Sequence, residues 1–346
     1  MPATVETTRF GPVFPHRLDF RPRGPDERPA DEVLSDAITV TAVVKRFPQA
    51  MSPSLDRVSF RVAPGEVFGV LGFAGAGKST VLGVLATRLR PTGGRVLVGG
   101  TDVAAHPVLA RRSLALLPGH TTLDPAATTR QNLLAHATYH LISRPVRERR
   151  ADQLLESLEL RPVADARAGS LTPGEALRVM LARALMHDPR VLLVDEPRAT
   201  NAAARGFLRD RIVELKREGV TVVLASRELN EIEGICDRVA VLDRGKLVAT
   251  GKPATLIDRP RTLVLTVQLR GVCAEEVASM LGRMRSVRAV ERSPAEDTTL
   301  RFRLRCDEDP ARLLAEAVEV LGYVGVTTIS ALCGQVTLAD VMEDLK

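Results

Sequence analysis

The nine-residue stretch GFAGAGKST, residues 72–80, decides the fold of this 346-residue chain. It satisfies the pattern G-x-x-x-x-G-K-[ST], with both glycines, the lysine and the serine in their fixed places. A continuously apolar run, EVFGVLG at 66–72, precedes it and predicts a strand buried on both faces. An apolar helix is predicted to follow over Val81–Leu89. This order of strand, glycine-rich turn and helix is the context of a phosphate-binding loop.

In such a loop the glycines let successive backbone N–H groups converge on phosphates. The Lys78 ammonium is then expected to reach the β- and γ-phosphate oxygens, and the Ser79 hydroxyl to hold Mg²⁺. A purely structural glycine-rich turn is the alternative, but the strand-to-helix context favours the phosphate loop. The sequence therefore predicts binding of a nucleotide with Mg²⁺.

A second apolar run, VLLVDEP at 191–197, places two carboxylates at the end of a buried strand. Ligands bind at this edge of an α/β sheet. Asp195 is placed to bind Mg²⁺ through water, and Glu196 is placed to act as the general base toward the attacking water. A helix N-cap is the alternative role, and the phosphate loop upstream favours the catalytic one.

The rest of the chain alternates strand and helix patterns. ITVTAVV from Ile38 and LDRVSFRV from Leu55 alternate apolar and polar residues, as half-buried antiparallel strands do. Helical spacing marks 129–143 and 147–160, where Leu154, Leu155, Leu158 and Leu160 form one stripe. The later segments are a helix at Phe207–Glu218, a buried strand VTVVLAS at 220–226, and two strands joined by an Arg-Gly turn in VAVLDRGKLVATG.

The two ends of the chain have a different texture. Residues 1 to about 35 are polar, Pro-rich and aperiodic, which predicts a disordered arm. After a boundary near residue 255, strand and helix patterns follow in the order βαββαβ, with helices at 274–284 and 310–321. A last helical stretch, VTLADVMEDL at 336–345, ends the sequence.

Composition excludes several classes of protein. Net charge is +6, which fits an anionic ligand or a membrane surface, while 3% aromatic residues and no Trp argue against stacking on single-stranded nucleic acid. The basic run Arg144, Arg147, Arg149 and Arg150 lacks interleaved aromatics and predicts a solvated helix face rather than a nucleic-acid patch. The four cysteines are widely spaced with no CxxC pair, which indicates a reducing compartment. The sequence has no 18-residue apolar stretch and no signal peptide. We therefore expect a cytosolic chain that acts on a membrane only through a partner.

These motifs resemble the nucleotide-binding subunit of an ABC transporter. The 117 residues between Lys78 and Asp195 leave room for that family's inserted helical subdomain. LTPGEALRVMLARALMHDP at 171–189 lies where the family has its signature sequence, and CDRVAVLDRGKLVATG at 236–251 resembles the stretch after its switch histidine. The C-terminal stretch is similar to the accessory domain of daunorubicin-type drug exporters. Phe47 lies where the family stacks an aromatic ring on adenine, although a core-filling Phe is the alternative.

The resemblance implies an α/β fold, with a P-loop NTPase core that carries antiparallel β and helical subdomains, followed by the small α+β domain. The expected divisions are an arm at 1–36, an ATP-binding domain at 37–255 with its helical subdomain at about 119–190, and an accessory domain at 256–346. It also implies ATP and Mg²⁺ as ligands. The implied partners are a separate transmembrane permease and an identical or related ATP-binding domain, with no nucleic acid. The implied location is the inner face of the membrane. The residues expected to bind ATP are Phe47, Gly72, Phe73, Ala74, Gly75, Ala76, Gly77, Lys78, Ser79, Thr80, Thr172 and Gly174; Ser79 and Asp195 would hold the metal and Glu196 would be catalytic.

The sequence departs from the family at the positions that couple hydrolysis to dimer closure. Gly119 replaces the Q-loop glutamine, and the adjacent His120 is either a partial substitute or a surface histidine. In the signature, Pro173 removes a backbone donor. Thr172 and Gly174 either contact phosphate or simply begin a helix, because T-P-G-E is also a capping box.

Two further departures follow the second strand motif. Arg227 replaces the switch histidine, and it either holds a phosphate or is solvated or salt-bridged. The aspartate that the family carries near Ala202 is missing. The leading interpretation is therefore an exporter ATPase with slow turnover. A nucleotide-binding regulatory or assembly subunit is the alternative, and an ATPase acting on ribosomes or DNA is disfavoured because no tandem cassette or coiled-coil arm is present.

Overall fold

A computed structural model describes most of the chain. The described residues are 36–196, 202–232, 234–253, 261–268, 273–294, 299–306 and 310–334. The predicted arm at 1–36, apart from Asp36, lies outside them, as do the predicted helical stretch at 336–345 and the predicted boundary near 255.

The first strands form an antiparallel sheet in the order β2-β1-β4-β5. Its members are β1 (Ile38–Lys45), β2 (Leu55–Val62), β4 (Gly93–Val98) and β5 (Thr101–Asp102). β1 pairs with β2 and with β4 in antiparallel register, which confirms the two strands predicted from alternating residues. On β2, the buried Val58, Phe60 and Val62 alternate with exposed residues, because only one face of this sheet is covered.

A second sheet has six strands in the order β10-β9-β3-β8-β7-β6. They are β3 (Val67–Leu71), β6 (Leu114–Leu117), β7 (Val191–Asp195), β8 (Thr221–Ser226), β9 (Arg238–Asp243) and β10 (Lys246–Gly251). Five of these strands are parallel, and β10 joins antiparallel to β9 through the predicted Arg-Gly turn. The carboxyl ends of β3, β7 and β8 therefore meet at one edge of the sheet, which is where ligands bind in this architecture.

The central strands are buried on both faces, as the continuous apolar runs predict. Val67 and Leu71 of β3 belong to the core shared with the helices that follow β6. Phe68 and Val70 of the same strand belong to the core beneath the antiparallel sheet. Consecutive side chains point to opposite faces of a strand, so a strand between two cores is apolar at nearly every position.

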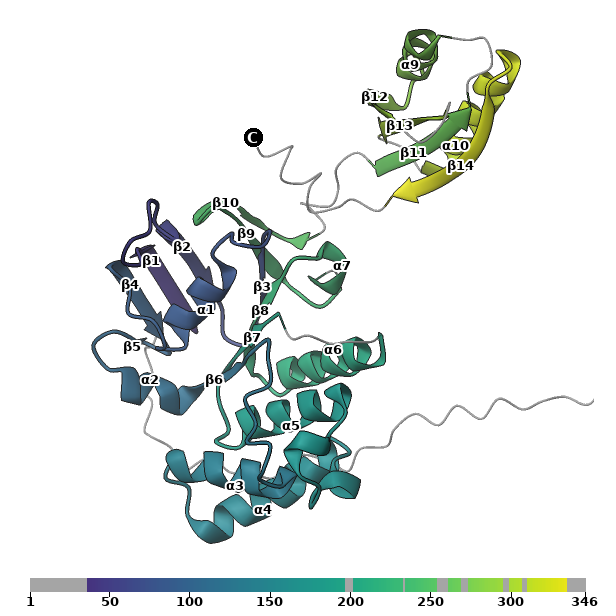
Figure 1. The fold of residues 1–346 in the computed structure, drawn as a ribbon. Coiled ribbons are helices and arrows are strands. Elements are labelled where there is room, and N and C mark those ends of the chain that lie inside the picture. Colours follow the sequence, from purple (N-terminus) through teal and green to yellow (C-terminus); the bar gives the residue numbers. More distant parts are fainter. Residues whose placement is uncertain are drawn as a thin grey trace, which may run out of the picture. The chain divides into compact units, whose positions relative to one another are not determined.

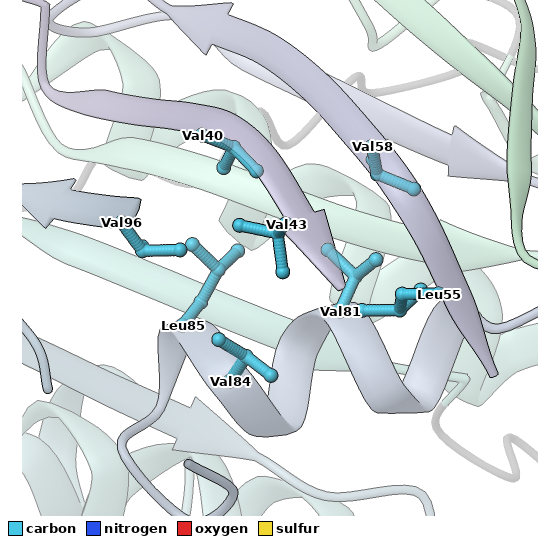
Figure 2. Close-up of a pocket in the computed structure, with 8 residues that line it drawn as sticks. All are labelled: Val40, Val43, Leu55, Val58, Val81, Val84, Leu85 and Val96. Carbon is cyan, nitrogen blue, oxygen red and sulfur yellow. The ribbon is translucent and has the colours of Figure 1, made fainter. Parts of the chain in front are cut away.

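Helix α1 (Lys78–Leu85) packs between the two sheets. The predicted bounds Val81–Leu89 were wrong at both ends, because the helix begins at the lysine of the loop and ends four residues earlier. Thr87 has a φ of 59°, and Leu89 folds back onto Gly83, where an added Cβ would lie 2.8 Å from Leu89 Cδ1. A small cavity between α1 and β1, β2 and β4 is lined only by apolar side chains, so it belongs to this core (Figure 2).

The remaining helices of this part are α2 (Pro107–Ser113), α3 (Thr129–Tyr139), α4 (Arg144–Ser157), α5 (Pro173–Leu185), α6 (Ala202–Arg217) and α7 (Leu229–Ile232). Two 3₁₀ turns, Arg161–Val163 and Ala168–Ser170, connect α4 to α5. Helices α3, α4 and α5 pack together on one side of the six-stranded sheet (Figure 1). All four leucines of the predicted stripe are buried there, although α4 ends at Ser157 because Glu159 turns the chain with a φ of 57°. None of the helices that the structure describes has the length and apolarity needed to cross a membrane.

The last part of the chain has its own sheet, in the order β12-β13-β11-β14, and every pairing in it is antiparallel. Its elements are β11 (Arg261–Gln268), α9 (Ala274–Gly282), β12 (Val287–Pro294), β13 (Thr299–Cys306), α10 (Pro310–Tyr323) and β14 (Thr327–Gly334). This order confirms the predicted βαββαβ pattern. The buried apolar residues of these elements form a separate core that includes Leu265, Leu281, Phe302 and Leu321.

Candidate nucleotide-binding site

The loop between β3 and α1 has glycines where side chains would not fit. Gly77 is the N-cap of α1 with a φ of 106°, and an added Cβ would lie 2.7 Å from the Ser54 carbonyl oxygen. At Gly72 an added Cβ would lie 2.6 Å from the Leu242 carbonyl oxygen. Gly75 has a φ of 79° but open space around it. The loop is thus packed against the protein at its two ends and accessible in the middle, as a phosphate cradle must be.

Lys78 is only 4% exposed, and its ammonium is fully engaged. Nζ donates to the carbonyl oxygens of Gly72 at 2.7 Å and Phe73 at 3.0 Å. It also forms an ion pair with Glu196 Oε1 at 2.7 Å. A buried charge requires such partners, so the loop and the Glu196 carboxylate together hold the lysine in place.

Ser79 and Asp195 meet at the ends of α1 and β7. The Ser79 hydroxyl donates to Asp195 Oδ1 at 2.9 Å. Burial and the neighbouring Glu196 charge raise the pKa of Asp195, while the Ser79 hydrogen bond partly opposes them. A hydroxyl and a carboxylate side by side are hard oxygen ligands, and this pair matches the donor set that Mg²⁺ prefers.

Glu196 follows directly after β7 and lies between two cations. Oε1 accepts from Lys78, and Oε2 accepts from Arg227 Nε at 2.8 Å. Burial would raise the pKa of Glu196, but the hydrogen bonds from Lys78 and then Arg227 outweigh burial and lower it. The structure thus shows Arg227 in a salt bridge whose partner is the predicted catalytic carboxylate, and contact of Arg227 with phosphate stays a prediction.

Gly119 lies just beyond β6, against the backbone that carries the two carboxylates. An added Cβ would lie 2.6 Å from the Asp195 carbonyl oxygen and 2.8 Å from that of Glu196. Glycine at this position therefore does more than remove the family's glutamine side chain, because any side chain would displace the end of β7. The adjacent His120 is exposed, in agreement with a surface histidine.

The signature-like segment begins helix α5 in the predicted way. Thr172 is the N-cap, Pro173 is the first helical residue, and Glu175 completes a capping box. The Thr172 hydroxyl donates to Glu175 Oε2 at 2.7 Å, and the Thr172 N–H donates to the same oxygen at 2.8 Å. Around Gly174 an added Cβ would meet nothing within 4 Å. The capping role is confirmed, and phosphate contact by Thr172 and Gly174 stays a prediction.

The other predicted nucleotide-binding residues surround this centre. Phe47 follows β1 and is half-buried, with Lys45 Nζ 5.1 Å from its ring centroid. None of the three apolar cores of the described residues includes it, which argues against the core-filling alternative. In the loop, Phe73, Ala74 and Gly75 are exposed, Ala76 is buried and Thr80 is half-buried.

Comparison with known proteins places this geometry in a family. The protein-family model with the description ABC transporter matches residues 55–199 of this chain. The Nod factor export ATP-binding protein I of Rhizobium sp. (strain N33) is 38% identical over 223 residues, which are 64% of this chain and 73% of that protein. The protein of the same name from Rhizobium etli is 38% identical over 202 residues, which are 58% of this chain and 64% of that protein.

Solved structures agree with these matches. A structure of an ATP-binding subunit of an ABC transporter has a TM-score of 0.58 at 26% identity, and the match covers 64% of this chain and 91% of that one. A nucleotide-free ATP-binding cassette from an ABC transporter has a TM-score of 0.57 at 25% identity, covering 63% and 92%. The chain belongs to the ABC transporter family, and within it to the ATP-binding subunits.

Proposed function

We propose that the chain is the ATP-binding subunit of an exporter whose membrane-spanning subunit is a separate chain. Support comes from the family and from the relatives, which are named Nod factor export ATP-binding proteins. The daunorubicin-type subtype stays a prediction, since its C-terminal stretch at 336–345 lies outside the described residues. In this proposal the chain lies in the cytoplasm, on the inner face of the membrane, and a second copy or a related chain pairs with its ATP-binding domain.

The observation that carries ATP binding is the Ser79–Asp195 pair beside the buried Lys78. Lys78 and the backbone N–H groups of 72–80 would hold the phosphates, and Ser79 and Asp195 would hold Mg²⁺. When bound, Mg²⁺ would neutralise charge on the β- and γ-phosphate oxygens. The packed glycines and the open centre of the loop fit this ligand. The adenine ring would stack on Phe47, whose ring is only half-buried.

Glu196 is the proposed general base, and its contacts explain why we propose slow hydrolysis. Each oxygen of its carboxylate already accepts from a cation, Oε1 from Lys78 and Oε2 from Arg227, and taking a proton from water would weaken both ion pairs by removing the negative charge. The same contacts lower the pKa of Glu196, and a carboxylate with a lower pKa is a weaker base. Across a dimer, Thr172 would likewise have to exchange its Glu175 contact for phosphate.

The basic run on α4 supports the absence of nucleic acid from this proposal. Arg144 pairs with Glu148 at 2.8 Å. Arg150 is buried and donates to the Leu185 carbonyl oxygen and to Asp188, so the predicted solvated face was wrong for Arg150. Arginines that already have acidic or carbonyl partners offer less charge to a phosphate backbone.

Titration calorimetry of the full chain with Mg-ATP tests the proposal. We expect the wild type to bind and Lys78→Ala to abolish binding. Lys216→Ala is the matched control, because its ammonium pairs with Asp237, which accepts from the Val67 N–H at the end of β3 opposite the loop. Equal titration curves for the wild type and Lys78→Ala would exclude nucleotide binding at this loop.

The ion pair between Arg227 and Glu196 favours a second candidate function. Here the chain binds ATP but scarcely hydrolyses it, and serves as a regulatory or assembly subunit of a membrane complex. Both candidates predict ATP binding, and they differ in whether a membrane subunit stimulates turnover. For either one we expect a basal rate of about 0.01 s⁻¹ or less, well below the usual range for phosphoryl-transfer enzymes. Stimulation of that rate by a membrane subunit would favour the exporter.

A further inference from the structure

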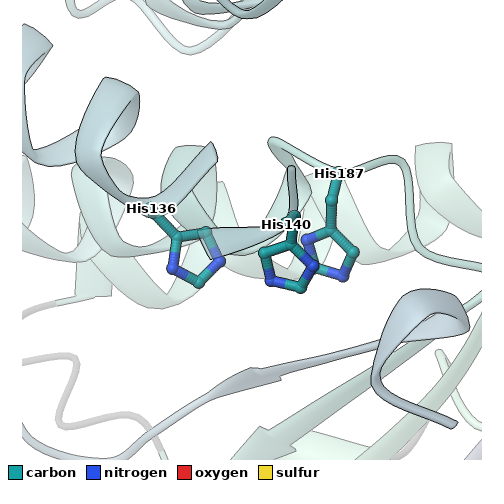
Figure 3. A group of neighbouring side chains, drawn as sticks. All are labelled: His136, His140 and His187. Carbon is teal, nitrogen blue, oxygen red and sulfur yellow. The ribbon is translucent and has the colours of Figure 1, made fainter. Parts of the chain in front are cut away.

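Three of the six histidines of the chain converge within the helical part, and none of them belongs to the nucleotide site. His136 and His140 lie one turn apart at the C-terminal end of α3, and His187 follows α5 (Figure 3). One ring nitrogen of each lies within 4.8 Å of one ring nitrogen of the other two. The rings of His140 and His187 are stacked with centroids 3.7 Å apart. Residues at i and i+4 share one face of a helix, so α3 presents two imidazoles to the third.

The hydrogen bonds of His187 leave one lone pair unused. Its Nε2 lies 3.0 Å from the Leu114 carbonyl oxygen. A carbonyl oxygen can only accept, so Nε2 carries the proton and Nδ1 carries the lone pair. Among the described residues this buried Nδ1 has no hydrogen-bond partner. A backbone carbonyl that fixes the tautomer of a histidine is also the arrangement that orients metal-binding imidazoles.

Burial favours the neutral form of all three imidazoles, which is the form that can donate a lone pair to a metal ion. Burial, followed by the neighbouring histidines, lowers the pKa of His136 to about 3 and that of His187 to about 4. Burial also lowers the pKa of His140.

Two cations next to the cluster narrow the choice of ion. The Arg183 charge acts on His136, and the Arg150 charge acts on His187. Arg150 also contacts Asp188, and Arg183 donates to the Thr122 carbonyl oxygen at 2.7 Å. Because local charge does not attract a cation here, affinity must come from the nitrogen–metal bonds. That requirement favours ions with a strong preference for imidazole over Mg²⁺ or Ca²⁺.

We propose that His136, His140 and His187 bind a divalent transition-metal ion of the Zn²⁺ type, with solvent as the fourth ligand. Zn–N bonds of about 2.0–2.1 Å in a tetrahedral site place ligand nitrogens roughly 3.3 Å apart. The His140 and His187 rings, which are nearly parallel, must tilt away from each other as the site closes, because both lone pairs have to point at one ion. The ion would connect the end of α3, the segment after α5 and, through Leu114, the start of β6. It would thus fasten the helical part to the six-stranded sheet.

The test uses untagged full-length protein, titrated with Zn²⁺ against a chromophoric chelator and with Co²⁺ for its visible spectrum. We expect one equivalent of ion and intense Co²⁺ bands typical of a four-coordinate, nitrogen-rich site. His136→Gln and His140→Gln should each weaken Zn²⁺ binding at least tenfold. Even the loss of a residue that only hydrogen-bonds a metal ligand lowers metal affinity about 10- to 100-fold. His106→Gln and His120→Gln are the matched controls and should bind like the wild type.

A second measurement guards against variants that fail to fold. At one Zn²⁺ concentration, the melting temperature should rise more for the wild type and for both controls than for folded His136→Gln or His140→Gln. Absence of binding by the wild type would overturn the proposal, and so would equal binding by the cluster variants. An ion that the cluster variants retain and Ser79→Ala loses would lie at the nucleotide site instead, which also overturns it.

Discussion

Replacing Arg227 tests whether its ion pair restrains the proposed general base. Arg227 Nε lies 2.8 Å from Glu196 Oε2, and the arginine side chain is 59% exposed. At that distance two unit charges attract by about 1.5 kcal/mol in water. Exposed pairs contribute about 0–1 kcal/mol after side-chain entropy and screening, so we take about 1 kcal/mol for this contact. If the contact must break before the transition state, removing it should raise turnover about fivefold.

The assay is phosphate release at saturating Mg-ATP. Arg227→Gln and Arg227→His are both expected to be about fivefold faster than the wild type, while Arg227→Lys, which keeps the charge, should stay slow. Arg57→Gln is the matched control, because Arg57 is an exposed arginine paired with Asp56 at 3.2 Å. Adding Glu196→Gln to the faster variants should return the rate to background.

Two outcomes would refute this reasoning. A large loss of turnover in Arg227→Gln would mean that the guanidinium stabilises the transferring phosphoryl group rather than restraining the base. A wild-type rate of several per second that Glu196→Gln stops would mean that the departures from the family do not slow the enzyme.

Three further predictions follow from the packing. Gly119→Gln should weaken Mg-ATP binding in calorimetry and lower the stability of the fold by about 1–3 kcal/mol in thermal melting, because the new Cβ would meet the carbonyl oxygens of Asp195 and Glu196. A faster ATPase in this variant would contradict the prediction. Thr172→Ala should cost about 1 kcal/mol and lower the melting temperature by about 2–4 °C, whereas Thr172→Ser should retain the cap. A chain that ends at Gly251 should stay folded by circular dichroism and still bind Mg-ATP, because the last four strands have a core of their own; an insoluble product would show a shared core.

The sequence by itself determined the features that depend on near neighbours. The glycine pattern of 72–80 predicted the loop, since the backbone conformations and close approaches there admit no larger residue. Alternation predicted the βαββαβ order of the last part, and Thr172 with Glu175 predicted a capping box, because those two residues are three apart on one helical turn.

The bounds of α1 and the chemistry of the site needed the tertiary structure. α1 ends early because Leu89 folds back onto Gly83. The Arg227–Glu196 pair spans 31 residues, and the Ser79–Asp195 pair spans 116. These partners meet because β3, β7 and β8 are neighbours in the sheet, and strand order is not encoded in any local spacing.

The histidine cluster, too, could be predicted from the sequence only in part. Spacing of i and i+4 on a predicted helix could have paired His136 with His140, but no local rule points to His187. Its position depends on how α5 packs against α3 and on the Leu114 carbonyl that fixes its ring. Likewise, the sequence showed that Gly119 lacks a side chain, and only the fold showed that the backbone of β7 fills the space where one would be. Residues far apart in the chain acquire such partners through burial and packing, which the complete fold decides.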